Sequence, residues 1–204
     1  MSKLLSIFPG HIEEHKIVAA ADCLKEGGIV IYPTDTIYAM GCGILHPQAI
    51  ERMANIKGIR PDKAVFSLIV HDFSHLTEYT RPVSTSVFKL MKRCLPGPFT
   101  FILEANSNIT RMMNSRRKTI GIRIPDNPVT LGLVEKLGVP LVSTSLHDDD
   151  EILKFPTDPD EIFNLYYDKA DVIINGGYGN NEESTVVDCT GDEPVIIRQG
   201  KGVL

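Results

Sequence analysis

The chain has 204 residues, of which 43% are hydrophobic and 23% are charged, and its formal net charge is -5. This composition is typical of a folded globular protein and excludes a disordered or fibrous chain, and the length predicts a single domain over residues 1–204. The acidic balance argues against a protein whose whole surface clamps nucleic acid, but it is compatible with a local basic groove.

The cysteines and the apolar segments narrow the class further. The four cysteines are scattered, without a Cys-x-x-Cys pair or a Cys/His spacing typical of zinc, so we interpret them as reduced core thiols. No stretch approaches the ~20 apolar residues that a membrane helix needs. Pro9 stops the short apolar patch at the N-terminus before it could act as a signal segment. We therefore predict no membrane contact and a cytoplasmic location.

The first part of the chain predicts helices and strands in turn. Residues 15–26 carry apolar side chains at helical spacing and end at Gly27-Gly28, and residues 29–32 follow as a buried strand. Residues 47–57 form a second predicted helix that Gly58 stops, and residues 65–70 form the next strand.

The rest of the chain continues the alternation and closes with two neighbouring strands. A helical segment is predicted to begin within residues 72–76, a charged loop at 148–151 and a turn at 176–179. Further helices are predicted over 83–94, 127–137 and 159–167, and strands over 99–104, 119–124, 139–143, 171–174, 185–188 and 195–198. The pattern predicts an α/β (α+β) fold, a twisted mixed sheet with flanking helices.

Small hydroxyl residues follow or end apolar, strand-like runs at three places, in residues 29–36, 141–145 and 184–187. In an open α/β sheet, ligands bind outside the carboxyl ends of the strands, so these hydroxyls are expected to face a carboxylate or a phosphate. Basic side chains that pair with such oxygens occur in or beside ordered segments, at Lys57, Arg60, Arg123 and Arg198. The combination predicts an anionic, oxygen-rich ligand.

Several common catalytic motifs are absent from the sequence. There is no GxxxxGK[ST], no GxGxxG after a strand and no GxSxG, so any nucleotide must be held mainly by side chains, and covalent hydrolase chemistry is disfavoured. His71 and His75 lack a third metal ligand, and His71 is either a ligand contact at a strand end or an exposed histidine.

Two groups of basic residues receive different interpretations. The run of Arg111, Arg116, Arg117 and Lys118 is interpreted as a solvated face. Arg123 lies in the apolar strand 119–124, where an arginine is unfavourable unless a carboxylate or phosphate meets it, so we predict that it faces the ligand.

Six motifs in collinear order carry a resemblance to a known family. They are Pro33-Thr34-Asp35-Thr36-Ile37-Tyr38-Ala39-Met40-Gly41, Pro96-Gly97-Pro98-Phe99-Thr100, Gly121-Ile122-Arg123-Ile124-Pro125, Ser143-Thr144-Ser145, Ser184-Thr185-Val186-Val187-Asp188 and Ile197-Arg198-Gln199-Gly200. With these motifs the chain resembles the YrdC/YciO family over nearly all of its length. The resemblance implies a YrdC-like fold with a concave, basic cavity.

The resemblance also implies an activity. Family members that are synthases condense L-threonine, bicarbonate and ATP into threonylcarbamoyl-AMP and pyrophosphate, and a partner complex transfers the threonylcarbamoyl group to tRNA. Mg²⁺ is expected to enter with ATP, without a tightly bound metal held by the protein. The implied threonine contacts are Thr34 or Thr36, His71, Arg123, Ser143 and Ser184, and the implied ATP contacts are Lys57, Arg60, Thr119, Ser145 and Arg198, with Lys57 and Arg60 acting in catalysis.

Two departures from the synthase pattern leave other functions open. The usual Lys-x-Arg-Pro has an extra residue in Lys57-Gly58-Ile59-Arg60-Pro61, and the usual Ser-Ala-Asn reads Ser145-Leu146-His147. Together with the absence of a second domain within the 204 residues, they predict a member nearer the YciO branch. The alternatives are a protein that binds tRNA or double-stranded RNA without synthase activity, a hydrolase acting on threonylcarbamoyladenosine in tRNA, and a protein that only binds a small molecule.

Overall fold

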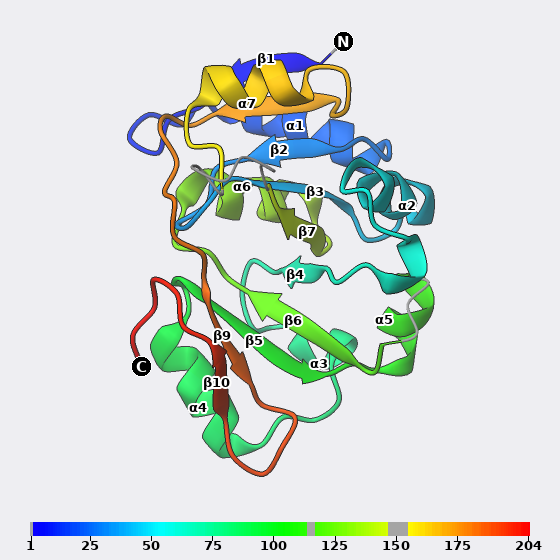
Figure 1. Cartoon of the computed structure of the whole chain (residues 1–204), viewed down its shortest axis with the longest axis vertical. Coiled ribbons are helices and arrows are strands. Elements are labelled where there is room, and N and C mark those ends of the chain that lie inside the picture. The colour runs from blue at the N-terminus through cyan, green and yellow to red at the C-terminus, as the bar shows by residue number, and fades with distance from the viewer. Residues whose placement is uncertain (1, 114–116, 147–154) are drawn as a thin grey trace.

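One mixed sheet of ten strands runs through the protein, with helices on both of its faces (Figure 1). The computed structural model describes residues 2–113, 117–146 and 155–204. The strand order is β1-β8-β2-β3-β7-β4-β6-β5-β9-β10. Four neighbouring pairs are parallel (β1/β8, β2/β8, β4/β6 and β5/β9), and the other five are antiparallel. The predicted fold class is confirmed.

The elements have the following bounds. The strands are β1 (Lys3–Ser6), β2 (Val30–Tyr32), β3 (Ala39–Gly43), β4 (Ser67–Ile69), β5 (Phe99–Glu104), β6 (Thr119–Arg123), β7 (Leu141–Ser145), β8 (Val172–Asn175), β9 (Thr185–Asp188) and β10 (Val195–Arg198). The helices are α1 (Glu14–Lys25), α2 (Pro47–Ile56), α3 (Leu76–Tyr79), α4 (Thr85–Cys94), α5 (Ser107–Met112), α6 (Pro128–Leu137) and α7 (Pro159–Tyr166), with a 3₁₀ turn η1 over Pro61–Lys63.

Local signals in the sequence explain where the helices begin and end. The Asn127 side chain accepts hydrogen bonds from the backbone N–H groups of Val129 and Thr130 and so caps the start of α6. Gly138, with φ of 76°, adopts the left-handed conformation that ends the same helix. Ser84 caps α4 in the same way as Asn127 caps α6.

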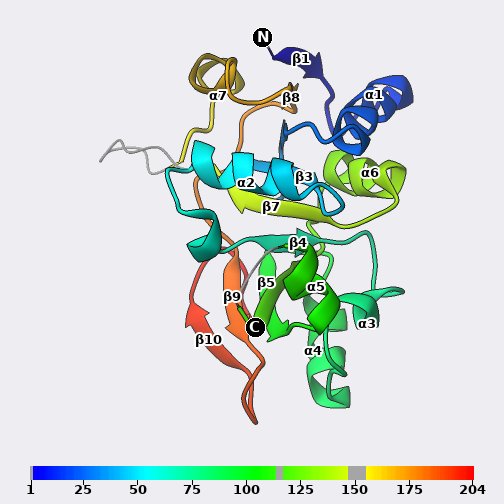
Figure 2. The same cartoon turned by 90° about the vertical axis from the view of Figure 1, so that its right-hand side faces the viewer.

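The two faces of the sheet carry separate apolar layers. Val30 and Tyr32 of β2 pack in the layer under α1 and α6, whereas Ile31 points to the opposite face with residues of α2 and α7, as the two-residue period of a strand requires. Figure 2 shows α1 beside α6 on one side of the sheet and α7 on the other. The layers bury the strands that position the polar residues described below.

Two strands and one α-helix were not predicted from the sequence. β1 is a short edge strand of four residues, β3 reads Ala-Met-Gly-Cys-Gly, and α5 is a helix of six residues. Two glycines and an alanine give β3 little intrinsic strand preference, so its conformation depends on pairing with β2 and β7. The predicted charged loop at 148–151 lies outside the described residues.

Candidate functional site

A cavity of about 490 Å³ brings together seven of the residues predicted to contact ligands. These residues are Lys57, Thr119, Arg123, Ser143, Ser145, Ser184 and Arg198. Apolar side chains, including Ile109 and Met113 near α5, form part of the wall. Hydroxyl and cationic groups therefore converge in one hollow that is partly apolar, as a site for a small anionic ligand requires.

The face of three adjacent strands forms the centre of the cavity floor, and residues of β5 and β9 extend it. Ser67 of β4 stands in register with Ser143 of β7 on one side and with Gly121 of β6 on the other. A Cβ atom at Gly121 would lie 2.8 Å from the Ser67 hydroxyl oxygen, so the glycine keeps the floor open. Arg123 lies two residues beyond Gly121 and therefore projects from the same face of β6.

The cavity lies elsewhere than the crevice expected at the carboxyl ends of the strands. Residues 141–145 all belong to β7, so Ser143 and Ser145 are strand residues and not residues that follow a strand ending at 143. β7 is antiparallel to both β3 and β4, and the carboxyl ends of these neighbours consequently do not meet at one edge of the sheet. Much of the site lies on the sheet face instead.

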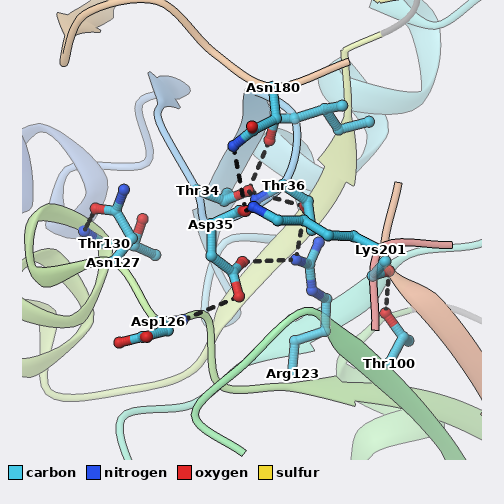
Figure 3. A network of polar contacts seen from close by, with 12 residues as sticks. Thr34, Asp35, Thr36, Thr100, Arg123, Asp126, Asn127, Thr130, Asn180 and Lys201 are labelled. Carbon is cyan, nitrogen blue, oxygen red and sulfur yellow. Dashed lines mark hydrogen bonds and ion pairs between the residues drawn. The ribbon is translucent and has the colours of Figure 1, made fainter. Parts of the chain in front are cut away.

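Arg123 is the most deeply buried charge in the cavity lining, at 6% exposure. Its Nη2 atom lies 3.3 Å from an Asp35 carboxylate oxygen and donates to the Thr36 hydroxyl at 3.0 Å, as Figure 3 shows. Burial lowers the pKa of Arg123, and the Asp35 carboxylate opposes that shift. Its Nε atom is buried and has no hydrogen-bond partner among the described residues. Both hydrogen bonds within the chain come from Nη2, and Nη1 makes none among the described residues, so the guanidinium keeps N–H groups for a ligand acceptor.

Asp35 was not among the predicted site residues, although the sequence argument required an anion beside Arg123. Its carboxylate also accepts from the backbone N–H of Asp126 at 3.1 Å. Its backbone carbonyl accepts from Asn180 at 3.3 Å and from the Lys201 ammonium at 2.6 Å, so three separate segments from the second half of the chain hold it in place (Figure 3). The signal in the sequence was the acidic residue inside the Thr34-Asp35-Thr36 triplet.

Thr34 and Thr36, predicted as substrate contacts, are both buried and stand behind the cavity lining. The Thr34 hydroxyl donates to the carbonyl of Ile37 at 2.7 Å and accepts from the N–H of Thr36 at 3.0 Å, which closes the turn between β2 and β3. Thr36 accepts from Arg123. In this structure both threonines shape the cavity through other residues.

The Ser184 region is held by a second arginine. Ser184 lies 2.8 Å from the Thr100 hydroxyl, and Arg198 donates to the carbonyl and the hydroxyl oxygen of Ser184 at 3.0 and 3.2 Å. Arg198 also forms an ion pair of 2.5 Å with Glu183. Arg198 thus lines the cavity and at the same time fixes Ser184 through contacts within the chain.

Comparison with known proteins assigns the family. The Sua5/YciO/YrdC family model, described as telomere recombination, matches residues 22–200. The chain belongs to this family. Escherichia coli YciO, an uncharacterized protein, is 39% identical over 204 residues, with 99% of this chain and 97% of that protein covered. A crystal structure of E. coli YciO matches with a TM-score of 0.90 and 38% identity, over 100% of this chain and 98% of that one.

Relatives of known activity are more distant. A threonylcarbamoyl-AMP synthase of Pyrococcus abyssi is 32% identical over 192 residues, which cover 93% of this chain and 55% of that protein. The crystal structure of P. abyssi Sua5 complexed with L-threonine matches with a TM-score of 0.87 and 30% identity, over 98% of this chain and 58% of that one. The chain therefore spans little more than half the length of these two proteins.

The Lys57–Arg60 segment, which carries the extra residue of the Lys-x-Arg-Pro motif, lies partly in the cavity and partly at the surface. Lys57 follows α2, lines the cavity and donates to the carbonyl of Ser145 at 3.0 Å. Gly58 turns the chain with φ of 65°, and the Arg60 side chain is 72% exposed and pairs with Asp62 at 3.0 Å. The structure thus places Lys57 in the cavity and Arg60 outside it.

His71 is likewise not brought to the cavity. It lines a separate hollow of about 210 Å³ with Asp72, His75 and Tyr79, and its Nδ1 atom lies 3.6 Å from the Asp72 carboxylate. The predicted contact of His71 with the same ligand as Arg123 has no geometric support here. His147, the other departure from the family pattern, lies outside the described residues.

Some lining residues were missed or read differently from sequence. Arg117 belongs to the basic run interpreted as a solvated face, yet it lines the cavity, as do Ser67 and Glu183. No periodic pattern marks these residues, because each comes from a different segment.

Within residues 2–113, 117–146 and 155–204, no three His, Cys, Asp or Glu side chains gather as metal ligands do. No helix in these residues is long and apolar enough to cross a membrane.

Proposed function

We propose that this protein condenses L-threonine, bicarbonate and ATP into threonylcarbamoyl-AMP and releases pyrophosphate. The observation that carries the proposal is the buried Arg123 with an unpartnered N–H in a hydroxyl-lined cavity. The P. abyssi relatives support it, since one is a threonylcarbamoyl-AMP synthase and the other has been crystallised with L-threonine.

The threonine carboxylate is proposed to bind beside Arg123. The cavity lining offers donors suited to a carboxylate. They are an N–H of the Arg123 guanidinium and the hydroxyls of Ser143 and Ser184. Thr36 and Asp35 act through Arg123, whose guanidinium they orient.

The ATP phosphates are proposed to face the remaining polar lining. Lys57, Thr119, Ser145 and Arg198 line the same cavity, and Arg60 would have to leave Asp62 to join them. Mg²⁺ would enter with ATP, and when bound it would offset the charge of the phosphates that Lys57 and Arg198 face.

The proposed chemistry needs no protein nucleophile. The threonine amine attacks the carbon of bicarbonate, a C–N bond forms and water leaves. An oxygen of the resulting carbamate then attacks the α-phosphorus of ATP, the bond from the α-phosphorus to the bridging oxygen breaks, and pyrophosphate departs. The cavity contributes positioning and stabilises the charge that develops on the phosphate oxygens, with the Lys57 ammonium as the proposed cation. A partner complex acting on tRNA is the proposed consumer of the product.

The test is pyrophosphate release from ATP, bicarbonate and Mg²⁺, measured with and without L-threonine. We expect threonine-dependent release by the wild type and a loss of at least about tenfold in Ser184→Ala, because a hydrogen bond to a charged group contributes roughly 1.5–3 kcal/mol. Tyr38→Phe is the matched control, since it removes a buried hydroxyl that bonds to the Gly176-Gly177 backbone.

Absence of threonine-dependent release from folded wild-type protein would contradict the proposal. Two measurements then distinguish the alternatives predicted from sequence. Hydrolysis of threonylcarbamoyladenosine in modified tRNA would identify a hydrolase, and steeply salt-dependent RNA binding would identify an RNA-binding protein.

A further inference from the structure

Tyr32 reaches the cavity lining from two strands away. It belongs to β2 and is fully buried, and its phenol oxygen lies 2.5 Å from the hydroxyl oxygen of Ser143 in β7. β3 runs between these strands, and the residue of β3 that pairs with Ser143 is Gly41. A Cβ atom at Gly41 would lie 3.1 Å from the Tyr32 ring, so the glycine leaves the space that the ring occupies.

The direction of this hydrogen bond follows from burial. Burial raises the pKa of Tyr32, so the phenol keeps its proton. Ser143 is its hydrogen-bond partner among the described residues. If Ser143 were the donor, the phenol O–H would be buried without an acceptor, which is the unfavourable arrangement. Tyr32 therefore donates and Ser143 accepts.

A serine that accepts in this way has its own proton left to donate. Ser143 lines the cavity, as Arg123 does, and the Arg123 guanidinium is a second donor group with an N–H left without an acceptor among the described residues. Two such donors match a group that only accepts hydrogen bonds, such as a carboxylate. A neutral hydroxyl or amide, which also donates, finds no matching acceptor in them. The preference for an anion then depends on Tyr32, which does not line the cavity but holds Ser143 as a donor.

We infer that Tyr32 is a positioning residue that holds Ser143 as a hydrogen-bond donor and thereby makes the cavity select a carboxylate over a neutral analogue. The inference deepens the proposed function and rests on it, because it takes threonine as the carboxylate ligand. Gly41 leaves room for this contact, since a Cβ atom there would lie 2.8 Å from the Val142 carbonyl oxygen, 3.0 Å from the Leu141 side chain and 3.1 Å from the tyrosine ring.

The experiment compares two ligands by calorimetry, L-threonine and L-threoninol, in which a hydroxymethyl group replaces the carboxylate. For Tyr32→Phe we expect threonine affinity to fall about three- to tenfold, the range of one net hydrogen bond. Threoninol affinity should change little, because its hydroxyl can donate to Ser143 when Ser143 is no longer held as a donor. The ratio of threonine affinity to threoninol affinity should therefore fall.

Two further variants make the interpretation specific. Ser143→Ala should cause the same loss, and adding Tyr32→Phe to it should cause no further loss, since Tyr32 acts through Ser143. Tyr38→Phe should keep the wild-type ratio, because its hydroxyl is also largely buried but bonds to Gly176 and Gly177. If Tyr32→Phe fails to fold, Ser143→Ala still measures the ratio.

The outcomes separate the inference from the proposed function. A wild-type protein that binds threonine, together with an unchanged ratio in Tyr32→Phe or additive losses in the double variant, would overturn the inference alone. A folded wild-type protein that does not bind threonine would overturn both.

Discussion

Arg123 and Arg60 are both basic residues expected to contact ligands, but the fold buries Arg123 and leaves Arg60 exposed to solvent. Arg123 is 6% exposed, paired with Asp35 and bonded to Thr36, whereas the Arg60 side chain is 72% exposed and pairs with its near neighbour Asp62. A buried ion pair has a defined geometry because leaving it is unfavourable, and an exposed pair exchanges readily with water. The Arg123 region is therefore preorganised, while Arg60 must move to reach a phosphate.

The contrast between Arg123 and Arg60 predicts different behaviour for the two proposed substrates, threonine and ATP. A carboxylate that reaches Arg123 meets a guanidinium that Asp35 and Thr36 already hold in place, so its binding requires little reordering. The Lys57–Arg60 segment turns at Gly58 and has one cation in the cavity and one outside it. We expect threonine binding to be insensitive to changes in this segment and ATP use to be sensitive to them.

The largest effect is expected from breaking the buried pair. Arg123→Ala leaves the Asp35 carboxylate buried without its cation, and we expect the free energy of unfolding in urea to fall by about 3–5 kcal/mol. The double variant Asp35→Asn/Arg123→Met removes both charges and should lose less.

The matched control for that experiment is Arg52→Ala. The Arg52–Asp171 pair is about 40% exposed on both sides, at 42% and 39%, and its loss should have a much smaller effect. Equal losses in Arg123→Ala and Arg52→Ala would show that burial of the Arg123 pair contributes nothing.

The second effect separates Lys57 from Arg60. Lys57→Ala should lower threonine-dependent pyrophosphate release by roughly a hundredfold, as removal of one charge-stabilising donor does in other active sites. Arg60→Ala should cause a much smaller loss, comparable to that of Arg81→Ala, whose exposed side chain pairs with Glu104. A loss in Arg60→Ala as large as that in Lys57→Ala would mean that Arg60 enters the cavity when ATP binds.

A deletion sharpens the same comparison. Removing Ile59 restores the Lys-x-Arg-Pro spacing and brings the arginine one residue nearer to Lys57. We expect the KM for ATP to fall several-fold and the calorimetric affinity for threonine to stay unchanged. Ile59→Ala is the control, because it keeps the chain length and the hydrogen bond from the N–H of residue 59 to the carbonyl of Ala54. An unchanged KM for ATP in the deletion would show that spacing does not limit ATP use.

The smallest effect is expected at Lys201. Its ammonium donates to the Asp35 carbonyl at 2.6 Å, and Asn180 donates to the same oxygen at 3.3 Å, so one donor remains after Lys201→Met. We expect about a two- to threefold loss of threonine affinity, below the value of a full hydrogen bond. Lys136→Met, which removes an ion pair with Glu14 on the α1 and α6 side, should leave the affinity unchanged.

Much of the fold was predictable because its signals are local. The helix over 128–137 shows its Asn127 cap, its first-turn proline and its glycine stop in the sequence, and strand Phe99–Glu104 was predicted with its observed bounds. β3 was not predictable in this way, since its glycines and alanine have no strand preference of their own and take that conformation from β2 and β7.

In the candidate site, too, some features follow from local sequence and others depend on tertiary contacts. The sequence by itself determined that Arg123 needs an anionic partner, because an arginine in an apolar strand is unfavourable without one, and it predicted that the hydroxyls of separate strands share a site with this arginine. Only the tertiary structure decided that Asp35 is this partner, that Tyr32 reaches Ser143 across Gly41, and that Arg60 and His71 lie apart from the cavity. Residues distant in the chain become neighbours through strand pairing and packing, and no spacing along the chain encodes those contacts.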